Sequence, residues 1–308
     1  MARPRYRALS VGGLTLAVEA PPDLPWDWPA GPLRRFRAPL ARPDLRVRVR
    51  VGRPEEPPSS ALRYDSRGGI FDVAEVGGEW IVALRIRGEL QRVARFDADL
   101  REGEVVVAPT SSYARERHYP LAYPLDEVVF FHRLAREGGL LVHACGAAAS
   151  GGLRLFTGPS GAGKTTFARL ARRHAGAAIL SDDRIVLRPD GRSGVLAWGT
   201  PWHGDAPLSL ATRVPLAAVY AIYHARDMEP RPLSGAAAAT ALLGNAFLPA
   251  HDPVATERAL AFAARLVETV PVVRLGFPKD VRAVRYAFAP AVEASPWGTA
   301  TAAAAAAP

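Results

Sequence analysis

The sequence predicts an α/β protein in which a β-rich N-terminal domain precedes a three-layer α/β domain with a mixed sheet. Three observations support this fold class. Residues 1–120 contain runs in which apolar and polar side chains alternate with the period of two that is typical of β-strands. From about residue 125 onward, apolar strand-like runs alternate with stretches of helical spacing. Within that second part, a glycine-rich loop joins an apolar run to a helix-like stretch, as in phosphate-binding loops.

The N-terminal domain is expected over residues 1–120. In Leu45–Val51 every second residue is apolar and the intervening ones are arginines, which indicates a strand with one buried face. The basic and then apolar beginning of the chain imitates a signal peptide, but Gly12-Gly13 interrupts it and both flanks alternate like a hairpin, so we expect no secretion. The remaining strands are predicted at Tyr6–Val11, Leu14–Glu19, Ile70–Val76, Glu79–Arg87 and Glu104–Ala108.

The second domain is expected over residues 121–290, followed by an Ala-rich tail, residues 291–308, that is expected to be disordered. Helices are predicted at Leu125–Glu137, Lys164–His174, Gly235–Phe247 and Val254–Thr269. Strands are predicted at Leu140–Ala149, Leu153–Thr157, Ala177–Ser181, Arg184–Arg188, Val195–Trp198, Ala217–Tyr223, Val272–Phe277 and Val281–Phe288.

Composition narrows the class of protein. With 49% hydrophobic and 22% charged residues among 308, the chain can bury a substantial core. The 39 basic residues include only two lysines, Lys164 and Lys279, so the other 37 are arginines; they are scattered, and we expect no nucleic-acid partner. The single cysteine, Cys145, excludes disulfides and zinc ribbons within one chain. Since no apolar run reaches about 18 residues, we expect no membrane span and a cytoplasmic protein.

The strongest chemical signal is the segment Gly158-Pro-Ser-Gly-Ala-Gly-Lys-Thr165, which matches the phosphate-loop pattern GxxxxGK[ST]. Glycines let successive backbone N–H groups point at one anion, and the positive end of the following helix adds to the attraction. Lys164 is expected to reach the β- and γ-phosphates of ATP, and the Thr165 hydroxyl to bind Mg²⁺. The residues expected to contact the nucleotide are Gly158, Pro159, Ser160, Gly161, Ala162, Gly163, Lys164, Thr165 and Thr166.

Two common classes of phosphate-loop protein do not fit the sequence. A GTPase needs Asn-Lys-x-Asp to read guanine, but the one asparagine, Asn245, is followed by alanine. An ABC ATPase needs Leu-Ser-Gly-Gly-Gln, whereas Leu233-Ser-Gly235 continues into alanines.

More informative is the predicted strand Ala177–Ser181, which is followed directly by Asp182 and Asp183. Carboxylates beside a phosphate loop can hold Mg²⁺ or take the proton of an acceptor hydroxyl, and both can face the phosphate only if the chain turns there.

Three pieces of the sequence together resemble the HPr kinase/phosphorylase family, which is distantly related to the ATP-dependent phosphoenolpyruvate carboxykinases. These pieces are Leu141-Val-His-Ala144, the phosphate loop and Ser181-Asp-Asp-Arg184, with His143 lying 21 residues before Lys164 as in that family. The resemblance covers about residues 140–188. It implies that Asp182 is the base that deprotonates an acceptor serine, that Asp183 contacts metal or phosphate, and that His143 lies near the γ-phosphate.

The family's second signature, an acidic metal ligand followed by Arg-Gly, is not recognisable. In its place stands Gly199-Thr-Pro-Trp-His-Gly-Asp205. Asp205 is a candidate replacement for the missing metal ligand; Trp202 and His203 are candidates to touch nucleotide or acceptor, or else to pack. The departure makes the chain more similar to divergent HPr kinase-like proteins found beside peptide-modification genes, for which a serine in a small peptide is a plausible acceptor.

These observations lead to one main expectation about function and two alternatives. The main expectation is an ATP- and Mg²⁺-dependent kinase that phosphorylates a hydroxyl of a protein or peptide. The sequence is compatible with a homo-oligomer and does not determine the oligomeric state. The first alternative, motivated by the missing signature, is an ATP-binding switch or accessory subunit without transferase activity. The second is carboxykinase-type chemistry, which would need an arginine-lined carboxylate pocket. His118, Tyr119 and Tyr123 either line an acceptor groove or pack at the domain junction.

Overall fold

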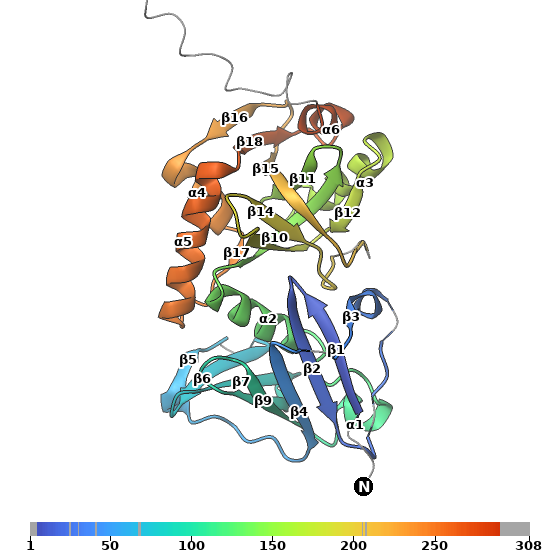
Figure 1. Cartoon of the computed structure of the whole chain (residues 1–308), viewed down its shortest axis with the longest axis vertical. Coiled ribbons are helices and arrows are strands. Elements are labelled where there is room, and N and C mark those ends of the chain that lie inside the picture. Colours follow the sequence, from blue (N-terminus) through green and yellow to red (C-terminus); the bar gives the residue numbers. More distant parts are fainter. Residues whose placement is uncertain are drawn as a thin grey trace, which may run out of the picture.

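The computed structural model describes residues 5–24, 26–29, 31–40, 42–66, 69–204, 206 and 208–289. The tail that the sequence predicts to be disordered, residues 291–308, lies outside this range. Within it the chain is a mixed α/β fold with two large mixed sheets, one in each half of the chain, that lie one above the other along the long axis (Figure 1). No helix of the described part is long and apolar enough to cross a membrane.

The N-terminal sheet has nine strands in the order β3-β1-β2-β4-β9-β8-β7-β6-β5. Its inner strand β4 buries Leu45, Val47 and Val49 and exposes the arginines between them, as the alternation predicts. Because β4 runs parallel to both β2 and β9 while the other pairs are antiparallel, the sheet is mixed. The strands are β1 Arg5–Val11, β2 Leu14–Ala20, β3 Arg37–Ala38, β4 Leu45–Val51, β5 Leu62–Tyr64, β6 Phe71–Val76, β7 Glu79–Ile86, β8 Glu89–Phe96 and β9 Glu102–Val107. Two 3₁₀ turns, Pro32–Phe36 and Ser59–Ala61, and helix α1, Ser112–Glu116, complete this half.

The second sheet follows the order β11-β10-β13-β14-β15-β18-β16, with β12 and β17 also pairing with β10. It is mixed because β15 runs parallel to β11 and β18, whereas its pairing with β14 is antiparallel. The strands are β10 Leu140–Ala149, β11 Gly152–Thr157, β12 Ala178–Ser181, β13 Arg184–Pro189, β14 Val195–Trp198, β15 Arg213–His224, β16 Pro230–Leu233, β17 Ala246–Phe247 and β18 Val272–Phe277. The helices are α2 Leu125–Arg136, α3 Lys164–His174, α4 Gly235–Leu243, α5 Pro253–Thr269 and α6 Val281–Ala287.

Helices cover both faces of this second sheet (Figure 1). Alternate residues of β11 show the two faces: Leu155 belongs to the core formed with α4 and α5, whereas Phe156 belongs to the core formed with α3 and α6. The ring of Phe156 stacks on Phe167 of α3, with centroids 3.8 Å apart. The strand that leads into the glycine-rich loop is therefore buried on both sides, which fixes the position of the loop.

One predicted element is wrong, and another is correct only in its first part. The segment Val281–Phe288, predicted as a strand, forms helix α6: the Asp280 side chain accepts a hydrogen bond from the Arg282 N–H and caps it, and Ala283, Val284 and Ala287 bury one helical face. The helix predicted over Gly235–Phe247 ends at Leu243, because residues 246–247 instead form β17 and pair with β10. Tertiary pairing here overrides local helix propensity.

Helix α2 lies between the two sheets (Figure 1). Its apolar residues, among them Val129 and Phe130, belong to the same core as the N-terminal strands. That core also includes Leu141, Val186 and Trp202 from the second half of the chain. The two halves are therefore packed together through a shared apolar core, and α2 positions residues for both of them.

The first turn of α2 buries a carboxyl group, Asp126, which is 3% exposed. Burial raises its pKa to about 7, and this effect exceeds the lowering by the Glu127 N–H bond and by the charge of Arg92. The folded protein therefore holds a proton that the unfolded chain releases above pH 3.8, so this group's stabilising contribution is lost as pH rises from about 4 to about 7.

We expect Asp126→Asn to raise the free energy of unfolding by about 1–3 kcal/mol at pH 8 and to change it little at pH 4, because asparagine cannot ionise. Urea denaturation at the two pH values measures this difference. An equal loss of stability at both pH values would show instead that the carboxyl group is needed for packing.

Candidate nucleotide-binding site

The glycine-rich loop joins the end of β11, at Thr157, to the start of α3, at Lys164. Two of its glycines cannot be replaced without disturbance. Gly158 has a φ of +156°, and a Cβ added there would lie 2.3 Å from the Ile222 carbonyl oxygen. Gly163 has a φ of +104° in the left-handed region, and its Cβ would lie 2.8 Å from the Phe277 ring. At these two glycines the loop thus packs closely against the backbone of β15 and against a side chain of β18.

The start of α3 supplies two features that favour an anion. The first amides of the helix, at Lys164, Thr165 and Thr166, have no partner within the helix, and the helix dipole places partial positive charge there. No acidic residue lies in the first turn to offset this charge. The end of α3 that faces the loop therefore provides donors and charge suited to phosphate oxygens.

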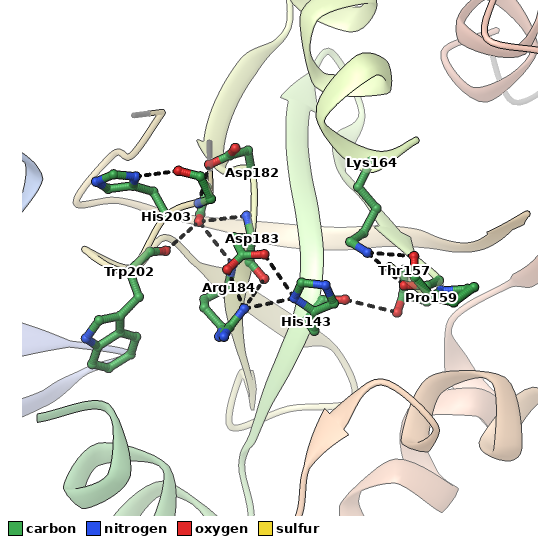
Figure 2. Close-up of polar contacts among 12 residues, drawn as sticks. His143, Thr157, Pro159, Lys164, Asp182, Asp183, Arg184, Trp202 and His203 are labelled. Atoms are coloured by element: carbon green, nitrogen blue, oxygen red, sulfur yellow. Dashed lines mark hydrogen bonds and ion pairs between the residues drawn. The ribbon is translucent and has the colours of Figure 1, made fainter. Parts of the chain in front are cut away.

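Lys164 is buried, and its ammonium group lies on the loop itself (Figure 2). The Nζ donates to the carbonyl oxygens of Gly158 and Pro159, at 2.8 and 3.1 Å. Burial lowers the pKa of Lys164, while the negative charge of Asp183 acts in the opposite direction. The ammonium is thus enclosed by the loop and lies within electrostatic reach of Asp183.

The two aspartates lie in the turn between β12 and β13, and their side chains have different partners (Figure 2). Asp182 is 2% exposed, and its two oxygens accept from the backbone N–H groups of Gly204 and Ala206, both at 3.2 Å. Burial raises the pKa of Asp182 despite these two bonds. Asp182 therefore fastens the segment that follows β14 to the end of β12.

Asp183 lies against His143 and Arg184. Its Oδ1 is 3.0 Å from His143 Nδ1, and its Oδ2 accepts from Arg184. Burial alone would raise the pKa of Asp183, but the hydrogen bond from His143 and the charges of Arg184 and Lys164 outweigh it and lower the pKa. Asp183 is thus an ionised carboxylate within the electrostatic reach of the loop lysine.

His143 connects the aspartate to the loop strand. Its carbonyl oxygen accepts from the Thr157 hydroxyl at 3.3 Å, and its ring Nδ1 lies 2.8 Å from Arg184 as well as 3.0 Å from Asp183. A protonated Nδ1 donates to Asp183, whereas an unprotonated one accepts from Arg184. The ring is 31% exposed, so it is open to a ligand on one side.

Arg184 continues this network away from the loop. Its Nε donates to Glu127 of α2 at 2.6 Å, and its guanidinium lies over the Phe247 ring of β17 at 4.6 Å. Glu127 is 5% exposed, and burial raises its pKa even though Arg184 lowers it. The ionic chain from His143 to Glu127 therefore ties the candidate site to the junction helix.

The structure brings two of the predicted catalytic residues, Lys164 and His143, together with Asp183, which the resemblance assigns to metal or phosphate. The predicted base, Asp182, instead accepts hydrogen bonds from backbone amides. Asp205, a candidate metal ligand, lies outside the described residues. Within the described ranges, no group of three or more His, Cys, Asp or Glu side chains is arranged to hold a metal ion. The residues here suit Mg²⁺ if phosphate oxygens of a bound nucleotide and the Thr165 hydroxyl supply further ligands. Mg²⁺ is usually bound in this way in nucleotide sites.

The segment after β14, which contains Trp202 and His203, contacts helix α2 and strand β12. Trp202 is buried against Phe130 of α2, with ring centroids 5.7 Å apart, and its carbonyl oxygen accepts from the Ser181 hydroxyl. His203 is exposed, and its ring lies against the adjacent Gly204 carbonyl oxygen at 2.8 Å. Trp202 thus belongs to the interior between the two halves.

One residue beside the loop was not predicted from the sequence. A Cβ at Gly163 would lie 3.9 Å from the Cε of Lys279, an exposed residue with a φ of +59° between β18 and α6. The two lysines of a chain with 37 arginines therefore both lie at the glycine-rich loop. The rarity of lysine, which draws attention to Lys164, is the signal that also identifies Lys279.

Comparison with known proteins adds no further constraint on the site. No protein-family model matches the chain, and no curated protein matches it.

Proposed function

We propose that the chain is an ATP- and Mg²⁺-dependent phosphotransferase of the HPr kinase-like type, which transfers the γ-phosphate to a hydroxyl, such as that of a serine, in a protein or peptide. The observation that carries this proposal is the ionised carboxylate Asp183 beside His143 and within reach of the charge of Lys164. A loop for a polyphosphate and a carboxylate for an acceptor proton are the two parts that such a transfer requires.

The residues of the loop fit a nucleoside triphosphate. The amides at the start of α3 donate to phosphate oxygens, and the Lys164 ammonium exchanges its bonds with the Gly158 and Pro159 carbonyls for bonds with phosphate. Thr165 offers its hydroxyl to Mg²⁺, which neutralises phosphate charge when bound. Phosphoryl transfer depends mainly on positioning and charge, so few side chains are needed.

In this proposal Asp183, rather than Asp182, takes the proton of the acceptor hydroxyl. A base must first lie within reach of its proton, and only then does its pKa matter. Asp182 is nearly inaccessible and both its oxygens accept backbone N–H groups, which suits a positioning role for the segment that follows β14. The loose transition state of phosphoryl transfer demands little basicity, so the lowered pKa of Asp183 is compatible with this role.

Incubation with [γ-³²P]ATP and the peptides encoded by neighbouring genes tests the proposal. We expect a labelled peptide whose label is stable to acid, as in a phosphoserine. Absence of any labelled product, together with ATP binding in a calorimetric titration, would favour the second candidate function, an ATP-binding switch. That alternative is supported by the contacts of Asp183 with both His143 and Arg184, because these partners already compensate the negative charge of the carboxylate.

Lys279 provides a separate test of the nucleotide site. We expect Lys279→Ala to weaken ATP binding about threefold to fivefold at low salt, because an exposed ammonium beside the loop contributes a modest, screened attraction. The loss should shrink at 0.5 M NaCl and should be smaller for AMP than for ATP. Isothermal titration measures these affinities, with Arg285→Ala, an exposed charge of α6, as the control. Equal ATP affinity of wild type and Lys279→Ala would remove Lys279 from the site.

A further inference from the structure

A groove of about 570 Å³ lies where the N-terminal sheet, helix α2 and the segment after α4 meet. Its walls are mainly apolar and aromatic, with Tyr64 and Phe71 from the N-terminal sheet, Phe131 from α2, and Phe247 and Leu248 from the second half of the chain. This volume lies in the range of sites that bind small molecules or peptide side chains. The two halves of the chain therefore form the groove jointly.

The groove and the candidate nucleotide site share one side chain. Arg184 lines the groove, and its guanidinium also contacts Asp183 and His143. Glu127, the other partner of Arg184, lines the groove as well. A molecule in the groove therefore lies one side chain away from the carboxylate that we propose to accept a proton.

The charged groups of the groove are already paired. Arg63 is bound to Glu75 at 3.1 Å, and Arg184 to Glu127 at 2.6 Å. His251 lies 2.7 Å from His132, nitrogen to nitrogen, and burial lowers the pKa of both rings, so the pair is uncharged at neutral pH. With its charges compensated, the groove offers an apolar surface rather than a field that selects a charged ligand.

Two short strands border the groove. β5 is the last strand of the N-terminal sheet, and β17 pairs with β10 alone within the described part of the chain. Strands with an unpaired side can bind an extended peptide through backbone hydrogen bonds while pockets take its side chains. Tyr64 of β5 and Tyr123 stand at the groove with 42% and 59% of their surfaces exposed.

We infer that this groove binds the acceptor as an extended peptide segment, with an aromatic side chain of the peptide beside the acceptor serine. The inference rests on the proposed transfer of phosphate to a peptide hydroxyl and names the chemistry of that peptide. The aromatic walls hold the neighbouring side chain, and Arg184 marks the end of the groove at which the serine approaches Asp183.

Saturation-transfer difference NMR with blocked tripeptides Ac-Xaa-Ser-Xaa-NH₂ tests this inference without requiring activity, because the method detects millimolar binding. The flanking residue is Trp, Phe, Leu, Lys or Glu in separate peptides. We expect the strongest transfer to the rings of the Trp and Phe peptides and at least a fivefold reduction for Ala250→Trp, which fills the groove from an exposed position. Ala264→Trp, the same change on the exposed side of α5, should leave binding unchanged.

Equal transfer to the Lys or Glu peptides, or aromatic binding that Ala250→Trp does not reduce, would overturn the inference. ATP titration of the same three proteins separates this failure from that of the proposed function. Intact ATP binding without aromatic selectivity removes the groove and leaves the nucleotide site, whereas absent ATP binding by the wild type removes the phosphate donor itself.

Discussion

Lys164→Ala is expected to lower the rate of phosphate transfer by about 10²–10³-fold, the loss typical of removing one preorganised donor from developing charge. The ammonium lies buried inside the loop, where it donates to the carbonyls of Gly158 and Pro159. Among the residues that the structure describes, no other lysine or arginine side chain donates to these two carbonyls. ATP binding should weaken as well, because the loop then holds a triphosphate with backbone amides alone. Transfer of label from [γ-³²P]ATP and a calorimetric titration measure the two effects.

Two further variants show whether the loss is specific to an ammonium at this position. Lys164→Arg should also be defective, because a planar guanidinium does not fit a loop that encloses a compact cation. Arg172→Ala removes an exposed positive charge at the far end of α3 and should leave both measurements unchanged. Thermal unfolding by circular dichroism checks that the variants fold. Transfer at the wild-type rate by a folded Lys164→Ala protein would contradict the role given to this lysine.

Asp183→Asn is expected to lower the turnover number by about 10²–10⁴-fold while ATP still binds, because the amide cannot take the acceptor proton. Asp182→Asn is expected to have a smaller effect on turnover, about tenfold or less, and to destabilise the segment that follows β14, since the amide group keeps only one acceptor oxygen for two backbone N–H groups. Steady-state kinetics of the two variants, measured side by side, compare the two carboxylates directly.

The dependence of the rate on Mg²⁺ separates a base from a metal ligand. If Asp183 takes the proton, the Mg²⁺ concentration for half-maximal rate should be the same in Asp183→Asn and in wild type. A large rise in that concentration would instead assign Asp183 to the metal, as the family resemblance implies. A large loss of turnover in Asp182→Asn with normal Asp183→Asn activity would restore Asp182 as the base.

Much of the fold follows from local sequence patterns. The alternation in Leu45–Val51, the glycine pair after Val11, and the strand–loop–helix around Gly158 are local signals, and the structure has the corresponding elements. The errors lie where tertiary contacts decide. Residues 246–247 have helix-compatible neighbours but pair with β10, and strand β8 was not predicted, because its partners β7 and β9 decide its conformation.

The site could be predicted only in part, for a physical reason. Neighbouring residues such as Asp182 and Asp183 share a sequence signal, but their environments are set by segments far away in the chain. The pairing of Arg184 with Glu127 joins residues 57 positions apart, and Lys279 reaches the loop only because β18 lies beside β15. For Lys279 the signal in the sequence is composition, since lysine is rare in this chain.

Hydrogen–deuterium exchange with and without 5 mM MgATP tests most directly whether the glycine-rich loop binds a nucleotide. Amides that donate to phosphate oxygens exchange slowly, so we predict that MgATP slows exchange in peptides covering residues 158–166 of the wild-type protein, and that Lys164→Ala shows less protection. Unchanged exchange in this segment with MgATP present, or protection confined to another part of the chain, would contradict the account.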